Sequence, residues 1–170
     1  MKLRSLALGL VLATSSFVAS AAAFTVALTP TTPNHLTASF GATPVLGSFT
    51  DVFTFTPNLN PGSSASAYFF NFSLDGLGSY DPALQILFST ADLNGNSFNV
   101  SNSTPFSQAG VFVPSTGGPL VLTVSGVSGG GSYSGVINVT MAPVPEPATY
   151  GMLGAGLALL GVVARRKRRS

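Results

Sequence analysis

Few side chains in the middle of this chain could carry out acid, base or metal-binding chemistry. Between residues 24 and 144 there is no lysine, arginine, glutamate or cysteine. Without cysteine the chain has no thiol nucleophile, no disulfide framework and no sulfur-ligated metal site. Catalysis or metal binding in this segment therefore depends on four aspartates and one histidine, together with its many hydroxyl groups. These five residues are Asp51, Asp75, Asp81, Asp92 and His35.

The stretch SFTDVFTFTP at residues 48–57 holds the most distinctive of these carboxylates. Because side chains alternate along a strand, Phe49, Asp51 and Phe53 fall on one face, and Phe55 continues that row. An ionised carboxylate is costly to bury without partners. We therefore expect Asp51 at the edge or end of its strand, where it accepts hydrogen bonds from loop N–H groups. The alternative is a calcium ligand, since that ion binds carboxylate and backbone oxygens.

Asp92 opens a second candidate calcium site. Oxygen-bearing side chains stand at positions 1, 3 and 5 of the segment that it begins, as in an EF-hand loop. The match then ends, because Ser97 and Ser103 stand where that loop needs a glycine and a bidentate glutamate. Asn94-Gly95 between two apolar segments instead predicts a tight hairpin turn.

Two hydrolytic arrangements use the remaining groups. His35 could act as the base for a serine nucleophile, but its early polar segment beside a Thr-Pro turn indicates a surface or strand-edge position. Two carboxylates could form a glycosidase pair, but the stretch LDGLGSYDP favours turn positions for Asp75 and Asp81. We therefore expect no enzyme activity, no metal site and no cofactor, with Asp51 and Asp92 as the alternative calcium ligands.

Short segments in which apolar and polar residues alternate must position these side chains. Between residues 24 and 140, glycine, proline, asparagine and serine interrupt the chain about every eight to twelve residues, without a capped helical period. This pattern predicts an all-β fold, a single antiparallel β-sandwich of jelly-roll-like form. Ser/Gly-rich loops are expected at 58–64 and 126–132. The expected strands are 24–29, 35–40, 49–56, 66–74, 83–89, 96–101, 110–114, 120–126 and 133–140.

The N-terminal segment has the three parts of a secretory signal peptide. Lys2 and Arg4 form a positive region, an apolar segment follows, and Ala21 and Ala23 supply the small-x-small site that signal peptidase needs. We predict cleavage after Ala23, with Ala21 and Ala22 as neighbouring alternatives. An uncleaved N-terminal helix is the competing interpretation, although its apolar segment is short for a membrane span.

Charge is distributed unevenly along the chain. All seven lysine and arginine residues lie among the first four and the last six residues. Four aspartates and no basic residue lie between residues 24 and 144, which gives that segment a formal charge of about −4. Nucleic-acid binding requires cationic side chains that displace counterions from phosphate. The central segment is therefore not expected to bind nucleic acid.

The C-terminal segment combines a Pro-Glu-Pro triplet, an apolar run and a basic end. As a helix, the uncharged residues 150–164 would be about 22 Å long, short of a hydrocarbon core of about 30 Å. A start at Pro147 brings the helix to the lower end of the spanning range. The basic cluster should stay in the cytoplasm, which places the central segment outside. The triplet is Pro145, Glu146 and Pro147, and the membrane stop is Arg165, Arg166, Lys167, Arg168 and Arg169.

This tail resembles the PEP-CTERM sorting signal of Gram-negative bacteria that produce exopolysaccharide. The resemblance implies recognition by exosortase, a membrane-embedded protease that cuts near the triplet, and delivery to the cell surface or an extracellular polysaccharide matrix. Phe49-x-Asp51-x-Phe53 in turn resembles the FxDxF family of PEP-CTERM proteins. The implied organisation is a signal peptide at 1–23, a β-sandwich domain at 24–140, a linker at 141–144, and a sorting signal with a short transmembrane helix at 145–170.

The leading hypothesis is an exported, non-enzymatic protein that is sorted and processed through its tail and ends up at the cell surface or in the matrix. An uncleaved membrane anchor is the competing interpretation of the tail. Its expected partners are signal peptidase, exosortase, the inner membrane transiently, and exopolysaccharide. The alternative is a carbohydrate- or calcium-binding module attached to exopolysaccharide, in which Tyr68, Tyr80 and Tyr133 would stack on sugars. A hydrolase, the third hypothesis, requires that the fold bring His35 or two aspartates together in a cleft.

Overall fold

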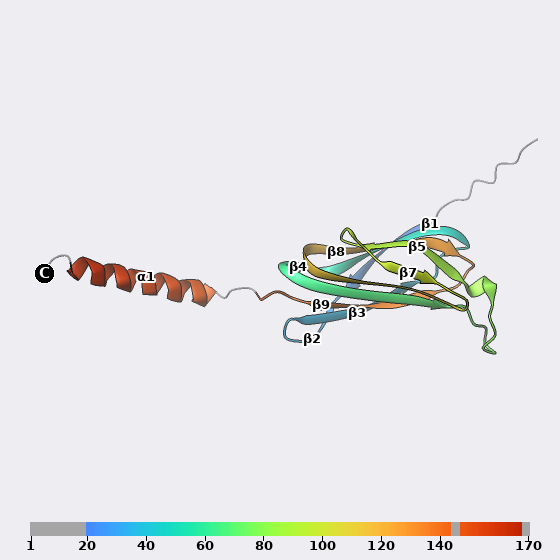
Figure 1. The fold of residues 1–170 in the computed structure, drawn as a ribbon, viewed down its shortest axis with the longest axis horizontal. Coiled ribbons are helices and arrows are strands. Elements are labelled where there is room, and N and C mark those ends of the chain that lie inside the picture. The colour runs from blue at the N-terminus through green and yellow to red at the C-terminus, as the bar shows by residue number, and fades with distance from the viewer. Residues whose placement is uncertain (1–19, 144–146, 168–170) are drawn as a thin grey trace, which may run out of the picture.

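The computed structural model describes residues 20–143 and 147–167 (Figure 1). The described residues form nine strands, one short 3-10 turn and one C-terminal helix. The elements are β1 Ser20–Ala27, β2 Thr29–Thr32, β3 His35–Ala42, β4 Gly47–Phe72, η1 Pro82–Leu84, β5 Ile86–Leu93, β6 Asn96–Ser97, β7 Asn99–Asn102, β8 Phe106–Ser128, β9 Tyr133–Thr140 and α1 Pro147–Lys167.

Two long strands, β4 and β8, form the frame of the fold. They pair antiparallel over residues 49–55 with 120–126, and again over 65–72 with 106–113. Shifts in register separate these two ladders. The first half of β4 and the second half of β8 lie between β1 and β5, while the other two halves lie between β9 and β7. The long hairpin therefore contributes strands to both layers of the sandwich.

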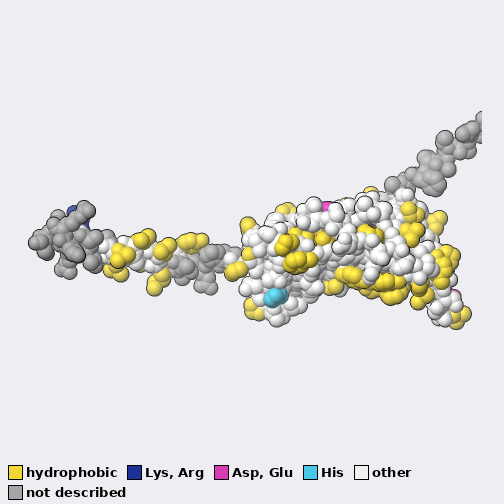
Figure 2. Space-filling model, in the orientation of Figure 1, with side chains coloured by type: hydrophobic (Ala, Val, Ile, Leu, Met, Phe, Trp, Pro, Cys, Tyr) yellow, Lys and Arg dark blue, Asp and Glu magenta, His cyan; other side chains and the backbone are white. Residues whose placement is uncertain are grey.

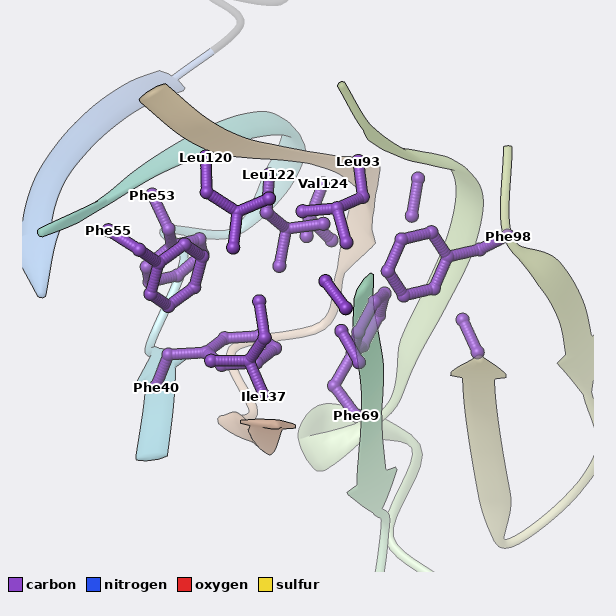
Figure 3. Close-up of a cluster of buried hydrophobic side chains, with 14 of the residues drawn as sticks. Phe40, Phe53, Phe55, Phe69, Leu93, Phe98, Leu120, Leu122, Val124 and Ile137 are labelled. Atoms are coloured by element: carbon purple, nitrogen blue, oxygen red, sulfur yellow. The ribbon is translucent and has the colours of Figure 1, made fainter. Parts of the chain in front are cut away.

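The core lies between these two layers. Phe53 and Leu122 come from the first ladder, and in Figure 3 they face Phe40, Phe69 and Ile137 across the interior. The rings of Phe40 and Phe53 have centroids 5.1 Å apart, which places β3 directly against β4 across the core. Burial of one apolar row per strand is the arrangement expected for a sandwich, and the all-β sandwich-like fold is confirmed.

The strand predictions were right in type but too short in the middle of the chain. Strand β9 occupies 133–140 as expected, whereas the expected loop at 58–64 lies inside the continuous strand β4. The expected strands 110–114 and 120–126 likewise merge into β8. Proline and glycine are tolerated there because the ladder is already irregular: the register shifts within this region, and Gly62 and Gly118 have φ values of 85° and 72°.

Strand β1 begins earlier than expected and runs parallel to β4, the exception in an otherwise antiparallel sandwich. Ser20 pairs with Phe49 and Ala23 with Val52, so the first half of β1 comes from the predicted signal peptide. Cleavage after Ala23 would leave only the second half of this strand. The remainder of the predicted signal peptide lies outside the described residues.

The tail contains a helix where a short transmembrane helix was expected. Helix α1 begins at Pro147 and extends away from the sandwich in Figure 1. Within residues 20–143 and 147–167, however, no helix combines the length and the apolar character needed to cross a membrane.

Substitution of Gly135 by alanine should lower the free energy of unfolding by about 2 kcal/mol, because the core has no room for a methyl group there. A Cβ atom at Gly135 would lie 2.5 Å from Phe69 Cβ and 2.7 Å from Phe40 Cζ. Urea denaturation of Gly135→Ala beside Gly76→Ala measures the effect, because nothing lies within 4 Å of a Cβ atom at Gly76. Equal stabilities of the two variants would contradict this packing.

Candidate functional site

Asp51 is buried in the interior, not placed at a strand edge or end as expected. Only 2% of its surface is exposed, and its strand β4 is flanked there by Ala22 of β1 and Val124 of β8. The sequence-based expectation was wrong because it did not include a partner from the opposite layer. The hydroxyl of Tyr133, on β9, donates a hydrogen bond of 2.8 Å to Asp51 Oδ2.

The three residues of the Phe-x-Asp-x-Phe motif all contact Tyr133 inside the core. The ring centroids of Phe49 and Phe53 lie 6.0 and 6.3 Å from that of Tyr133, one stacked and the other edge-on. A period of two puts all three residues of the motif on this face, so the phenylalanines pack on the ring while Asp51 accepts its hydroxyl. Through these contacts with Tyr133, the motif stabilises the packing of β9 against the first half of β4 across the core.

Burial sets the electrostatics of this pair. Loss of hydration raises the pKa of the Asp51 carboxyl above its ordinary value, and the hydrogen bond from Tyr133 offsets part of that rise. Burial also raises the pKa of the Tyr133 hydroxyl, and the hydrogen bond and negative charge of Asp51 raise it further. Burial thus shifts both groups toward their neutral forms, and the tyrosine remains a hydrogen-bond donor.

The other three aspartates stabilise turns. Asp75 Oδ1 accepts the N–H groups of Leu77 and Ser79 at 2.9 and 2.8 Å, and Asp81 caps the turn η1. These contacts confirm the expected turn positions. Across the described ranges, no group of three histidine, aspartate or glutamate side chains is arranged to hold a metal ion.

The predicted Asn94-Gly95 hairpin turn is confirmed. The two residues have φ values of 50° and 84°, the left-handed conformation that such a turn needs. They connect β5 to β6, and Asp92 Oδ1 accepts the Gly95 N–H at 2.6 Å. The carboxylate of Asp92 therefore closes the turn of the candidate calcium segment.

His35 lies at the exposed start of β3, in agreement with the expected surface position. Its Nδ1 is 3.2 Å from the hydroxyl of Thr140 on the neighbouring strand β9. The contact joins two strand ends. A catalytic base would instead need to contact a nucleophile in a cleft.

The sequence reasoning passed over one pattern with the spacing of a hydrolase nucleophile, Gly126-x-Ser128-x-Gly130. Ser128 is buried, its Oγ donates to the Pro44 carbonyl at 3.3 Å, and it accepts the Gly130 N–H at 2.9 Å. The nucleophile of that motif sits exposed on a turn from a strand into a helix. Here β8 ends at Ser128 and the chain continues into β9, so the serine closes a loop.

The three tyrosines proposed for sugar stacking lie in different surroundings. Tyr133 is buried, so its proposed role in stacking on a ligand is corrected. Tyr68 and Tyr80 are 39% and 42% exposed, and Tyr80 donates to Gln85 Oε1 at 2.9 Å. The structure therefore brings none of the three together as one site.

Asparagine amides hold strands and loops together, and the sequence reasoning missed them. Asn102 bonds both the N–H and the carbonyl of Phe88, and Asn94 bonds the N–H of Val121. Asn71, buried in β4, makes four hydrogen bonds. The signal that could have found them is the lack of basic residues between 24 and 144, which leaves amides and hydroxyls to satisfy interior polar groups.

The predicted processing sites lie at the limits of the described chain. Ala21 and Ala23 are exposed positions of β1, and Pro147 is the first residue of α1. The helix ends with three of the five basic residues. Lying outside the described residues are Pro145, Glu146, Arg168 and Arg169.

These features define a class, a compact all-β sandwich followed by an apolar helix with a basic end. Residues 143–169 match the family model of the PEP-CTERM protein-sorting motif. The chain therefore carries this motif, which marks it for exosortase-targeted export and cell-surface sorting as in Gram-negative bacteria. A search of curated proteins gave no match. The resemblance of Phe49-x-Asp51-x-Phe53 to the FxDxF family stays a prediction.

Proposed function

We propose that this is an exported, non-enzymatic β-sandwich protein that an exosortase sorts and processes at its tail, after signal peptidase has removed the N-terminal segment. Its destination is the cell surface or an extracellular matrix. The observation that carries the proposal is the sorting motif at residues 143–169, which coincides with helix α1. The β-sandwich is the domain that this signal directs to its destination.

The exposed side chains of α1 support recognition by a membrane-embedded enzyme. Leu153, Leu157 and Leu160 are between 62% and 67% exposed, and Figure 1 shows no part of the sandwich packed on the helix. Apolar side chains left in water favour a partner that covers them. Exosortase, encountered transiently at the inner membrane, would provide that apolar contact.

The non-enzymatic assignment rests on how the polar groups are used. The Asp51 carboxylate bonds Tyr133, and the other three aspartates bond backbone N–H groups in turns. Ser128 and His35 likewise bond neighbouring loop and strand atoms. A catalytic acid or base would be free to face substrate in a pocket, and these groups support structure instead.

Substitution of Glu146 by alanine should slow tail removal by about tenfold, the effect of losing one charged contact of about 1.5 kcal/mol. The exported protein should accumulate with residues 147–170 still attached. Intact-mass measurement on protein from culture and cell fractions reports the ends of the chain in one experiment. Thr149→Ala is the matched control outside the triplet. Tail loss at the normal rate in Glu146→Ala would refute the role of the triplet, and wild-type protein found only in the cytosol would refute export.

A further inference from the structure

An unusual concentration of aromatic side chains lies on the outer face of one layer. The second half of β4 and the first half of β8 point alternate side chains outward, and five of these are aromatic. Figure 2 shows hydrophobic side chains gathered where Figure 1 places this part of β4. We call this set the aromatic row: Tyr68, Phe70, Phe72, Phe106 and Phe112.

Four rings of the row, those other than Phe112, are neighbours on the sheet, and several rings remain open to solvent. Phe72 and Phe106 have centroids 4.7 Å apart, and Phe70 lies 5.4 Å from Phe72. Phe112, Phe72 and Tyr68 are 68%, 55% and 39% exposed. From Phe112 to Phe106 the row extends about 20 Å at the usual rise of a strand. A surface of this form suits an extended ligand better than a compact one.

Tyr68 is held in place along this surface. Gly110 pairs with it on β8, and a Cβ atom there would lie 3.3 Å from Tyr68 Cδ2, so the ring packs over the glycine. The hydroxyl of Tyr68 donates to Gln108 Oε1. A ring fixed in this way loses little conformational entropy when a ligand stacks on it.

The outer face of the other layer has a different composition. Thr50 and Thr54 of β4 and Thr123 and Ser125 of β8 point outward there, and the Thr50 and Ser125 hydroxyls lie 3.0 Å apart. Hydroxyl-bearing strands of this kind are common on solvent-facing sheets. Val52, Val121 and Val127 also point outward there, so the two outer faces differ in that only the first carries exposed aromatic rings, although the same two strands build both.

Charge defines the chemistry of a partner for the row. The segments that build this face, residues 60–72, 99–114 and 133–140, contain no aspartate, glutamate, lysine or arginine. Amide and hydroxyl groups border the rings instead, among them Gln108, Ser134 and Asn138. The face thus offers apolar surface with neutral hydrogen-bonding groups at its margin. An anionic polymer would find no cation here to compensate its charge.

We propose that the aromatic row binds a neutral polysaccharide chain, whose sugar rings stack on Tyr68, Phe72 and Phe112 while their hydroxyls bond the bordering amides and hydroxyls. Sugars combine an apolar ring face with hydroxyl edges, which matches this surface. The inference rests on the proposed function only for the place where the protein meets the polymer.

The exposed area argues against a second copy of the chain as the occupant. A fully exposed aromatic side chain offers about 200 Å², so the exposed fractions of the three most open rings amount to about 300 Å². A stable protein interface buries about 800 Å² on each partner. A polysaccharide needs no such area, because several rings of the row can each stack on a different sugar of the same chain.

Binding of the purified full-length chain to cellulose, mixed-linkage glucan and galactomannan tests the proposal, with the acidic polymer alginate for comparison. The wild-type chain should bind at least one neutral polymer and not alginate. Tyr68→Ala and Phe72→Ala should each weaken binding about two- to tenfold, the loss of one stacked ring. Thr50→Ala and Thr54→Ala, on the other outer face, should bind as wild type does. Thermal unfolding of every variant shows whether it is folded.

Several results would overturn the proposal. They are a folded wild-type chain that binds no neutral polymer, folded row variants with unchanged binding, and binding restricted to alginate. A dimer that sedimentation detects and the row variants dissociate, without polysaccharide binding, would assign the face to a second copy. Export and tail cleavage of the same variants are measured separately. Normal export without binding overturns this inference alone, whereas failed export of the wild type overturns the proposed function.

Discussion

Replacement of Tyr133 by phenylalanine should lower the free energy of unfolding by about 3 kcal/mol at pH 7 and by only about 1 kcal/mol in acid. The hydroxyl of Tyr133 donates to the buried carboxylate of Asp51 at 2.8 Å. Its removal leaves a charged group in the interior without that bond, which costs more than the loss of a neutral hydrogen bond. In acid the carboxyl is protonated, so only the smaller cost remains.

The pH dependence follows from the raised pKa of Asp51. Its folded-state pKa lies above the ordinary value of 3.8, so the native protein holds the proton more tightly than the unfolded chain between these two values. The stability that this group contributes is therefore fully present below about pH 3.8 and is lost as the pH rises through the folded-state pKa. Without the hydrogen bond from Tyr133 the pKa rises further, and the loss extends to higher pH.

Urea denaturation at about pH 3 and pH 7 measures both effects. Tyr80→Phe removes an exposed hydroxyl that bonds Gln85 and should change stability by less than about 0.5 kcal/mol. Asp51→Asn removes the titrating group, so its stability relative to wild type should increase with pH across the same window. A Tyr133→Phe variant that is equally destabilised at both pH values would show that the Asp51 carboxyl does not titrate in the native protein.

The fold class could be predicted from alternation and turn residues, but strand lengths could not. The Asn94-Gly95 turn and the strand 133–140 follow from local chemistry that acts over a few residues. Pro57, Pro61 and Gly62 lie beside or within residues 58–64 and favour a turn. These residues nevertheless belong to β4, because β4 pairs with β8 there through shifts in register. Tertiary pairing thus overrides a local turn preference, and no local pattern reports that pairing.

The orientation of β4 shows why the aromatic row was not foreseen. In SAYFFNF, the alternate sets are Tyr68, Phe70 and Phe72 on one face and Ala67, Phe69 and Asn71 on the other. Apolar bulk alone favours the first set inside, yet the structure buries the second. Buried Asn71 reverses the expectation because four hydrogen bonds satisfy its amide, and such partners come from loops distant in the sequence.

The linear sequence was sufficient to recognise the sorting motif in the tail, but it was not sufficient to explain the role of Asp51. The sorting motif is read as a linear pattern, so the triplet, apolar run and basic end could be recognised without a fold. The role of Asp51 depends on a tyrosine 82 residues away on another strand. A single sequence gives the cost of burying a carboxylate but not the partner that offsets it.

Substitution of Asn71 by alanine should have the largest effect on stability, a loss of about 4 kcal/mol. Its Nδ2 donates to the carbonyls of Leu84 and Ser132 at 3.0 and 2.8 Å, and its Oδ1 accepts from Ile86 N–H and Ser73 Oγ, both at 3.0 Å. Each buried polar group left without a partner costs about 1–3 kcal/mol. A domain of ordinary stability, about 5–15 kcal/mol, would lose much of its margin.

Asn71→Asp keeps the shape of the side chain but removes the NH₂ group, so it tests whether the two donated hydrogen bonds are needed. Aspartate keeps the acceptor for Ile86 and Ser73 but turns a carboxylate oxygen toward two carbonyl oxygens, so the loss should be at least as large and greater at pH 7 than in acid. Asn138→Ala is the matched control, since Asn138 is exposed and accepts one bond from Thr37. It should cost less than about 1 kcal/mol. Equal losses at the two asparagines would contradict the fastening role of Asn71.

Loss of the Asn71 side chain should also increase local opening of the structure near residue 71 more than opening of the sandwich as a whole. Three of its four bonds join β4 to the turn before β5 and to the loop before β9, so their loss should loosen those two connections first. Ser73→Ala removes one bond, should cost about 1 kcal/mol, and keeps the test measurable if alanine at 71 prevents folding. In Asn71→Ala, compared with wild type, we expect faster hydrogen exchange at the Ile86 amide and unchanged exchange at the Val121 amide. Uniform acceleration at both amides would mean that the side chain supports the whole sandwich equally.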